Sequence, residues 1–191
     1  GNGFVRTWYD QSGNRLHGEQ TTTANQPQIV SSGSIITAGS LQTLQFNGST
    51  QFLFLPVGAL NWERTQAFTF FAVANIASQN GYIVGKQQGS GNSTGWGVFH
   101  LTAASSPPGF GVQIRNQPGN QAWRYAAGSY STNTVYEAVY KGDSNATNIE
   151  LALNGANQSG TSFSNDLSAS VLNNVQATIG SRENGNEIGR A

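Results

Sequence analysis

The chain has 191 residues, and nine Lys and Arg residues balance nine Asp and Glu residues, so only 9% of the sequence is charged. A protein that binds nucleic acid by neutralising phosphates needs a stripe of Lys and Arg, and this composition argues against that function. No apolar run approaches the length of about 18 residues that a membrane-spanning helix needs. The absence of cysteine excludes a disulfide scaffold and a thiolate metal site.

Short runs rich in Val, Ile, Phe, Tyr and Thr recur along the chain, separated by Gly, Asn and Ser clusters at hairpin-like spacing. No segment sustains the helical period over three turns. We therefore expect strands at residues 4–9, 27–30, 41–46, 51–55, 67–76, 81–85, 95–102, 109–115, 121–127, 134–141, 148–153 and 174–180. This spacing predicts a single all-β domain, a two-sheet antiparallel β-sandwich of jelly-roll type.

The segment TWYDQSGN at residues 7–14 combines two aromatic residues with a polar turn. The side chains of Asp10, Ser12 and Asn14 can accept hydrogen bonds from nearby backbone, and Gly13 can adopt a positive φ. We therefore expect a strand that ends in a tight loop, with Asp10 in a structural role. Trp8 is assigned to the core, because a turn follows it directly.

This segment resembles the TWYDQSGNG signature of concanavalin A-like/laminin G-like β-sandwich modules. Later segments are similar to the family's QPRIV, LRFDGSDDYL, FTLFAVA and LRIGSR motifs, in the same order along the chain. They are QPQIV at 26–30, LQFNGS with QFL at 44–53, AFTFFAVA at 67–74 and ATIGSR at 177–182. The resemblance implies the sandwich fold and places Trp8 inside it. By the family pattern, this chain is an excerpt of a longer protein, trimmed at both ends.

Modules of this family occur in bacterial surface proteins and phage virion proteins, and fungal α-L-arabinofuranosidase B carries a variant of the signature. The resemblance therefore implies an extracellular, cell-surface or virion location. No segment here matches the catalytic segments of the arabinofuranosidase.

Catalytic chemistry finds little support in the sequence. Glycosidases of this architecture usually need two carboxylates that flank the scissile bond, and the compact E-x-D-x-x-E pattern is absent. Only Glu137 and Glu150 fall within predicted strands. The histidines are His17 and His100, and strand alternation places His100 on one face with Trp96. His100 is either a half-buried, hydrogen-bonded residue or a ligand-facing one. We predict that the chain is not an enzyme.

We predict no cofactor and no metal, although calcium is an alternative in this fold. The loops at residues 10–14 and 143–148 supply oxygen ligands that calcium prefers. Neither loop has the spacing of a calcium motif, and backbone capping by Asp and Asn side chains explains both.

Binding remains as a function, and aromatic side chains are the main candidates, because a flat ring can stack on a sugar. The candidates are Trp62, Trp96, Trp123, Tyr125 and Tyr130, with Arg115 and Arg124 as polar partners. Alternation places Trp123 and Tyr125 on one strand face and Arg124 on the other. We expect Trp96 and Trp123 to be exposed. Core packing is the alternative for each aromatic residue.

The sequence thus predicts a non-catalytic binding or adhesion module of a larger protein, which recognises glycans on a cell or polymer surface. The alternative is a structural or decoration module that contacts neighbouring copies or other subunits. A fragment of an arabinofuranosidase-type glycoside hydrolase is the third possibility.

Overall fold

The computed structural model describes residues 1–76, 81–89, 93–101, 109–117, 120–128 and 133–182. Over these residues the fold is all-β, and its paired strands are antiparallel. Two short 3-10 helices are also present, η1 (Thr23–Asn25) and η2 (Ala146–Asn148). Within this described part, no helix has the length and apolarity to cross a bilayer.

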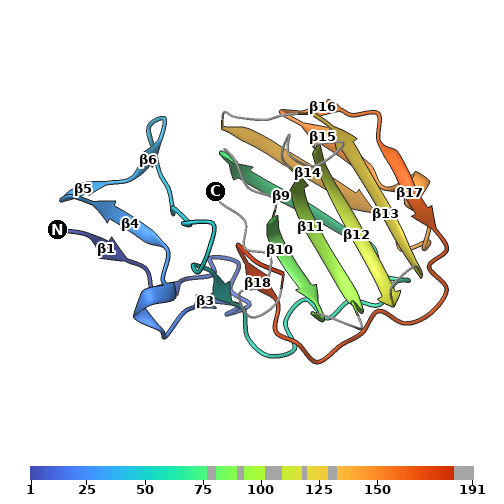
Figure 1. Ribbon diagram of the computed structural model, residues 1–191, viewed down its shortest axis with the longest axis horizontal. Helices are drawn as coiled ribbons and strands as arrows, with labels where there is room; N and C mark the ends of the chain where they lie inside the picture. The colour runs from blue at the N-terminus through green and yellow to red at the C-terminus, as the bar shows by residue number, and fades with distance from the viewer. Residues whose placement is uncertain (77–80, 90–92, 102–108, 118–119, 129–132, 183–191) are drawn as a thin grey trace.

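The larger of the two main sheets has nine strands (Figure 1). In spatial order they are β17 (Thr161–Asn165), β13 (Asn120–Ala127), β12 (Gly109–Gln117), β11 (Gly95–Leu101), β10 (Gly81–Gln87), β18 (Thr178–Ile179), β8 (Leu53–Phe54), β3 (Gly18–Glu19) and β2 (Thr7–Trp8). The second sheet comprises β16 (Ala156–Asn157), β15 (Glu150–Leu153), β14 (Thr134–Tyr140) and β9 (Phe68–Ala74). Figure 1 shows the four-stranded sheet layered against β10 to β13.

The main core lies between these two sheets, which makes the fold sandwich-like. Strand alternation turns Val98, Phe110 and Val112 inward from the nine-stranded sheet, and none of the three has measurable exposure. Tyr136 and Ala138 face them from β14. Burial of such apolar surface is the dominant favourable contribution to folding.

Trp96 is a central part of this core rather than a surface residue. Its ring stacks on Trp62 at a centroid distance of 4.5 Å, and Trp62 stacks on Phe68 at 4.6 Å. The Trp96 Nε1–H donates to the carbonyl of Leu60 at 3.1 Å, which satisfies the polar end of a buried indole.

The N-terminal arm is thin by comparison and extends away from the sandwich (Figure 1). It contains a three-stranded sheet of β1 (Gly3–Phe4), β4 (Gln28–Ser31) and β5 (Ser34–Ile35), and a hairpin of β6 (Thr37–Ala38) and β7 (Leu41–Gln42). No residue from 28 to 45 is buried. Backbone hydrogen bonds and capping side chains therefore carry most of its order.

The predicted strands agree well with the body of the sandwich. Those expected at 67–76, 95–102, 109–115, 121–127 and 134–141 correspond to β9, β11, β12, β13 and β14. The strand expected at 4–9 is instead split into β1 and β2. In each of the segments 41–46, 51–55 and 174–180, only two residues form a strand. The segments β3, β5, β6, β16 and β17 were not predicted.

Candidate functional site

The predicted exposure of Trp96 is wrong, since only 3% of the residue is accessible. The reason is that β11 turns Trp96, Val98 and His100 toward the core. His100 is 3% exposed, and burial lowers the pKa of its imidazole to about 4. The grouping of these residues on one face is confirmed, but that face is the inner one.

Trp123 and Tyr125 lie on the opposite, outer face of the nine-stranded sheet, which also carries Tyr82 and Phe99. Trp123 is half-buried and meets Phe99 edge to face at 5.8 Å, whereas Tyr125 is only 5% exposed. On this outer face the ring of Tyr82 packs over Gly97 and the ring of Phe99 over Gly111. A Cβ on Gly97, for example, would stand 2.2 Å from the ring of Tyr82. These aromatic residues therefore mainly fill the surface of the sheet.

A chain of amide hydrogen bonds crosses the same outer face. The Tyr82 hydroxyl lies 3.1 Å from Oε1 of Gln87, and Gln87 Nε2 donates to Gln113 Oε1 at 3.3 Å. Gln113 Nε2 then donates to Gln121 Oε1, and Gln121 Nε2 donates to Ser164 Oγ. Each amide nitrogen and oxygen in this chain has a partner, so a ligand would have to displace an existing bond.

The two arginines predicted as polar partners differ in position. Arg124 lies on the other strand face from Trp123, as predicted, and its Nη1 donates to the carbonyl of Thr147 in η2. It therefore ties η2 to β13 and does not stand on the outer face. Arg115 shares the outer face with Gln113 and is half-buried. Trp62 packs in the core, and Tyr130 lies outside the described residues.

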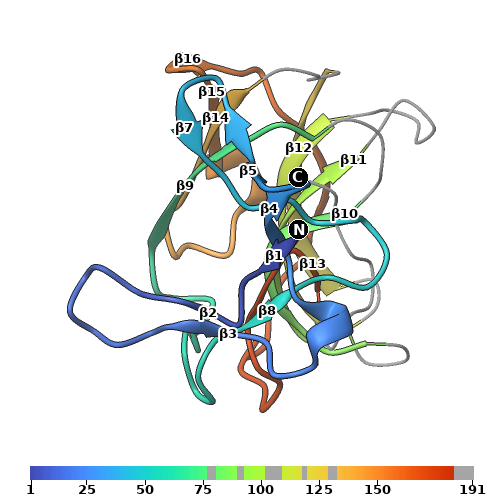
Figure 2. The same ribbon diagram turned by 90° about the vertical axis from the view of Figure 1, so that its left-hand side faces the viewer.

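The β2–β3 loop (residues 9–17) extends beyond the sheet, as Figure 2 shows. Asp10 organises it, as predicted. Its carboxylate accepts from the Ser12 N–H and hydroxyl, both at 2.8 Å, and from the Leu16 N–H at 3.0 Å. The backbone N–H of Ser12, followed by that of Leu16, holds the pKa of the Asp10 carboxyl below its usual value. Ser12 Oγ in turn accepts from the Asn14 N–H at 3.3 Å.

The assignment of Trp8 to the core is wrong, because the residue is 49% exposed. Trp8 lies in β2, the last strand of the nine-stranded sheet, so one of its flanks has no neighbouring strand. Its partner across the ladder is Gly18, which has no side chain to cover the indole. Tyr9, the next residue, is 64% exposed.

The same loop fixes the orientation of His17 and Arg15. The backbone N–H of Asp10 donates to His17 Nδ1 at 3.0 Å. The neutral ring therefore carries its proton on Nε2, and this N–H can donate to another group. Tyr9 stands beside it, with the two rings at 5.2 Å in an edge-to-face arrangement. Arg15 has a φ of +59°, a left-handed conformation that is uncommon for a residue other than glycine.

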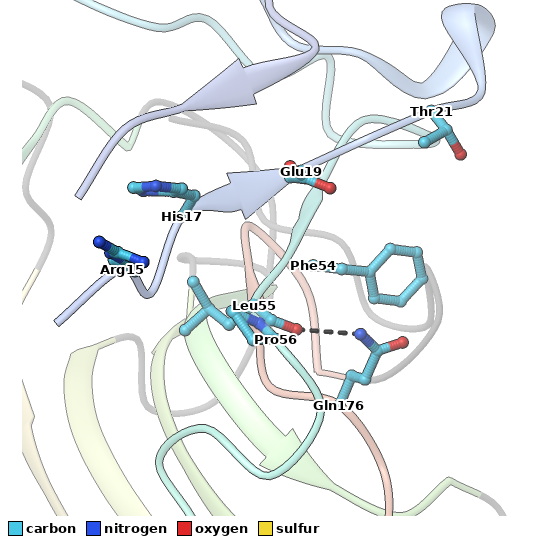
Figure 3. Close-up of a pocket in the computed structure, with 8 residues that line it drawn as sticks. All are labelled: Arg15, His17, Glu19, Thr21, Phe54, Leu55, Pro56 and Gln176. Atoms are coloured by element: carbon cyan, nitrogen blue, oxygen red, sulfur yellow. Dashed lines mark hydrogen bonds between the residues drawn. The ribbon is translucent and has the colours of Figure 1, made fainter.

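Arg15 and His17 are among the residues that line a pocket of about 330 Å³ (Figure 3). Its lining residues are Arg15, His17, Glu19, Thr21, Phe54, Leu55, Pro56 and Gln176. Arg15 and His17 lie toward one end, and Phe54 and Gln176 toward the other (Figure 3). Gln176 is held in place by its Nε2, which donates to the carbonyl of Leu55 at 3.0 Å.

The charged groups of this pocket are available to a ligand. Within the described part of the chain, neither Arg15 nor Glu19 forms a side-chain hydrogen bond or an ion pair. The small space is thus surrounded by four polar groups: the guanidinium of Arg15, the imidazole N–H of His17, the carboxylate of Glu19 and the hydroxyl of Thr21. The phenyl ring of Phe54 and the ring of Pro56 add apolar surface. Convergent polar groups beside apolar ones, in a volume near the lower end of the usual range, are typical of a site for a small polar ligand.

The acidic residues of the pocket lining and of the β2–β3 loop are Glu19 and Asp10. Glu19 is the only carboxylate among the lining residues of the pocket, whereas glycosidases usually use a pair at a defined separation. The oxygens of Asp10 are already occupied by N–H and O–H donors. Among the described residues no cluster of three or more His, Asp or Glu side chains could hold a metal ion.

The second loop considered for calcium is capped in the same way. Asp143 Oδ1 accepts from the Asn145 N–H at 3.0 Å, and Oδ2 accepts from Asn148 Nδ2 at 2.6 Å. Asn145 Oδ1 accepts from the Thr147 N–H and hydroxyl. Donors therefore point at the oxygens that would face a cation.

The sequence did not predict one group of residues in this pocket, namely Arg15, His17, Glu19, Phe54 and Gln176. The one available signal was the polar turn at Asp10, which precedes Arg15 and His17 directly. The sequence matches no model of a known protein family, and no curated protein matches it.

Proposed function

We propose that this protein is a non-catalytic glycan-binding module of jelly-roll type, related to the concanavalin A-like/laminin G-like sandwiches. Its binding site is the pocket of about 330 Å³ beside the β2–β3 loop, which we call the β2–β3 pocket. The observation that carries the proposal is the meeting of the Arg15 and Glu19 side chains, which have no partner within the described chain, with half-buried Phe54 around one small space. A location on a cell surface, outside the cell or on a virion is part of the same proposal.

The chemistry of a sugar fits these groups. Glu19 accepts hydrogen bonds from sugar hydroxyls, while Arg15 and the His17 Nε2–H donate to ring and hydroxyl oxygens. Phe54 and Pro56 offer apolar surface to the C–H groups of the sugar ring. The pocket volume of about 330 Å³ fits one or two sugar units, and the absence of a second lining carboxylate supports binding without cleavage.

The test is a glycan array on the purified protein, followed by titration calorimetry with the best glycan. Glu19→Gln keeps the shape of the side chain and removes its charge, and we expect at least a tenfold loss of affinity, about 1.4 kcal/mol. Glu150→Gln is the matched control, because Glu150 forms a surface ion pair with Lys141 at 2.5 Å, away from the pocket. It should bind like the parent.

Thermal unfolding of both variants should match the parent, since both glutamates are exposed. The proposal fails if the array gives no signal, or if Glu19→Gln binds the selected glycan as tightly as the parent.

A structural or decoration role is the second candidate function. One observation favours it, namely the exposed apolar residues of β9, where Phe71 is 63% and Val73 is 67% exposed. A glycan module has no need of such a surface for its ligand.

A further inference from the structure

Strand β9 forms one edge of the four-stranded sheet, next to β14 (Figure 1). Its sequence, FTFFAVA, contains no charged residue. Phe68 is buried, and Phe70 faces the core with it. Thr69, Phe71 and Val73 are exposed on the other side. An uncharged, regular edge strand of seven residues lacks the charges, prolines and bulges that usually keep such edges from pairing.

The register shows which backbone groups of β9 point to the open edge. The Val135 N–H donates to Asn154 Oδ1 at 2.8 Å, and its carbonyl accepts from the Asn154 N–H at 2.9 Å, so the backbone groups of Val135 face β15. In an antiparallel sheet, successive residues point their backbone groups to alternate neighbours. Tyr136 and the other even-numbered residues of β14 therefore bond to β9.

The partners of those β14 residues are Phe68, Phe70, Ala72 and Ala74. The N–H and C=O groups of Thr69, Phe71 and Val73 must consequently point outward, away from β14. Over the part of the chain that the structure describes, no group accepts from or donates to these three residues on that side. The edge thus presents three donors and three acceptors beside an exposed apolar surface.

We propose that β9 is the surface through which two copies of this chain associate, with their β9 strands antiparallel about a two-fold axis at Phe71. In this register Phe71 of one copy faces Phe71 of the other, and Thr69 faces Val73. Every outward N–H and C=O group then finds a partner, because the pattern is self-complementary. The two four-stranded sheets become one continuous sheet.

A second copy suits this edge because β9 is itself an uncharged strand of the kind that the edge can pair with, and the nearby charge does not oppose the pairing. Within β9 and β14 the charged residue is Glu137, which lies beside Phe71. In the dimer the two Glu137 residues are three strand spacings apart, roughly 14 Å, which exceeds the Debye length of about 8 Å at physiological salt. Their repulsion is therefore screened, while each copy supplies the uncharged strand that the edge accepts.

One edge strand on each side makes a small contact, in the size class of weak and transient interfaces. The dimer should accordingly form in a reversible equilibrium at micromolar concentrations. Glycan binding at the β2–β3 pocket uses none of these residues, so the two proposals can fail separately.

The experiment is sedimentation velocity on the parent and two lysine variants over a range of micromolar concentrations. We expect the parent to shift from monomer to dimer as concentration rises, and Phe71→Lys to stay monomeric. Val57→Lys is the matched control, because Val57 is 81% exposed and lies outside β9. It should dimerise like the parent. Thermal unfolding checks that both variants are folded.

A cysteine variant tests the register directly, since the chain has no cysteine of its own. Directly opposed residues of a hydrogen-bonded pair have Cα atoms about 5.5 Å apart, within the range of a disulfide. Phe71→Cys should therefore form a covalent dimer under mild oxidation, and Val57→Cys should not. A parent that stays monomeric throughout overturns the proposal and leaves the edge to an extended segment of another protein. Equal dimerisation of the parent and Phe71→Lys overturns it as well.

Discussion

Trp96 in the sandwich is 3% exposed, whereas Trp8 in the last strand of the same sheet is 49% exposed. Trp96 stacks on Trp62 and has its indole N–H satisfied, while Trp8 lies across from a glycine. The two residues show that an aromatic side chain stabilises the fold where its strand has a neighbour on each side and its ring faces the core, as in β11. At β2, the last strand of the sheet, the aromatic residues Trp8 and Tyr9 remain on the surface, near charged groups and a pocket.

The sharpest test of this comparison is truncation of both tryptophans. Trp96→Ala should lower the free energy of unfolding by about 3–5 kcal/mol, because it leaves a cavity in the aromatic stack. Trp8→Ala should cost about 1 kcal/mol or less, as for most partly exposed positions. Urea denaturation at neutral pH measures both. Similar losses in the two variants would contradict the distinction.

Acid should destabilise the body of the sandwich through His100. The pKa of its imidazole is about 4 in the folded chain against an ordinary value near 6.5. The folded state therefore favours the neutral ring, and this stability is complete above pH 6.5 and is lost as pH falls toward 4. The shift corresponds to about 3 kcal/mol.

Denaturation curves from pH 7 to pH 4 test the effect of His100. His100→Leu cannot titrate, so its stability should change less over this range than that of the parent, whatever the substitution itself costs. An equal decline in both proteins would assign the acid sensitivity to other groups.

A glycine comparison gives a smaller effect. The Cβ of Gly97→Ala would meet the Tyr82 ring at 2.2 Å, so the ring must move, at a cost of about 1–3 kcal/mol. In Gly18→Ala the nearest atom is Leu53 Cδ1 at 3.3 Å, the end of a flexible side chain. The loss should be smaller there, and thermal unfolding can rank the two variants.

The smallest effect on stability is expected for Asp10→Ala. The β2–β3 loop is exposed, so Tm should fall only slightly when its capping carboxylate is lost. Arg15 and His17 lose their fixed positions, however, and glycan affinity should fall. The low pKa of Asp10 implies that its capping is present above the ordinary carboxyl pKa and is lost as pH falls through the lowered value. Parent-like affinity would show that the loop does not position the pocket.

The sequence predicted the body of the sandwich well because its strands are long and alternate clearly. FTFFAVA and GFGVQIR leave little choice of structure, and alternation correctly placed Trp123 with Tyr125 and Arg124 opposite. Alternation cannot say which of two faces is covered, so the exposure of Trp96 was predicted wrongly. Short polar strands such as β16 and β17 pair because of their neighbours and carry no clear local pattern.

The pocket could not be predicted for a different reason. Glu19, Phe54 and Gln176 come from segments far apart in the sequence, and they meet because β3 and β18 both flank β8. Only the turn at Asp10 gave a local signal, and it identified the loop without the residues that the loop positions. Long-range strand order is what a single sequence reveals least.

The amide chain from Tyr82 to Ser164 has a direction, since each glutamine donates to the next. Reversing one amide would set oxygen against oxygen on one side and N–H against N–H on the other. The orientations of the three amides are therefore coupled, because the orientation of one fixes that of the next. Conversion of Gln113 to glutamate by hydrolysis would remove a donor in the middle of the chain, and the side-chain hydrogen bonds that link β10, β12, β13 and β17 would be disturbed together.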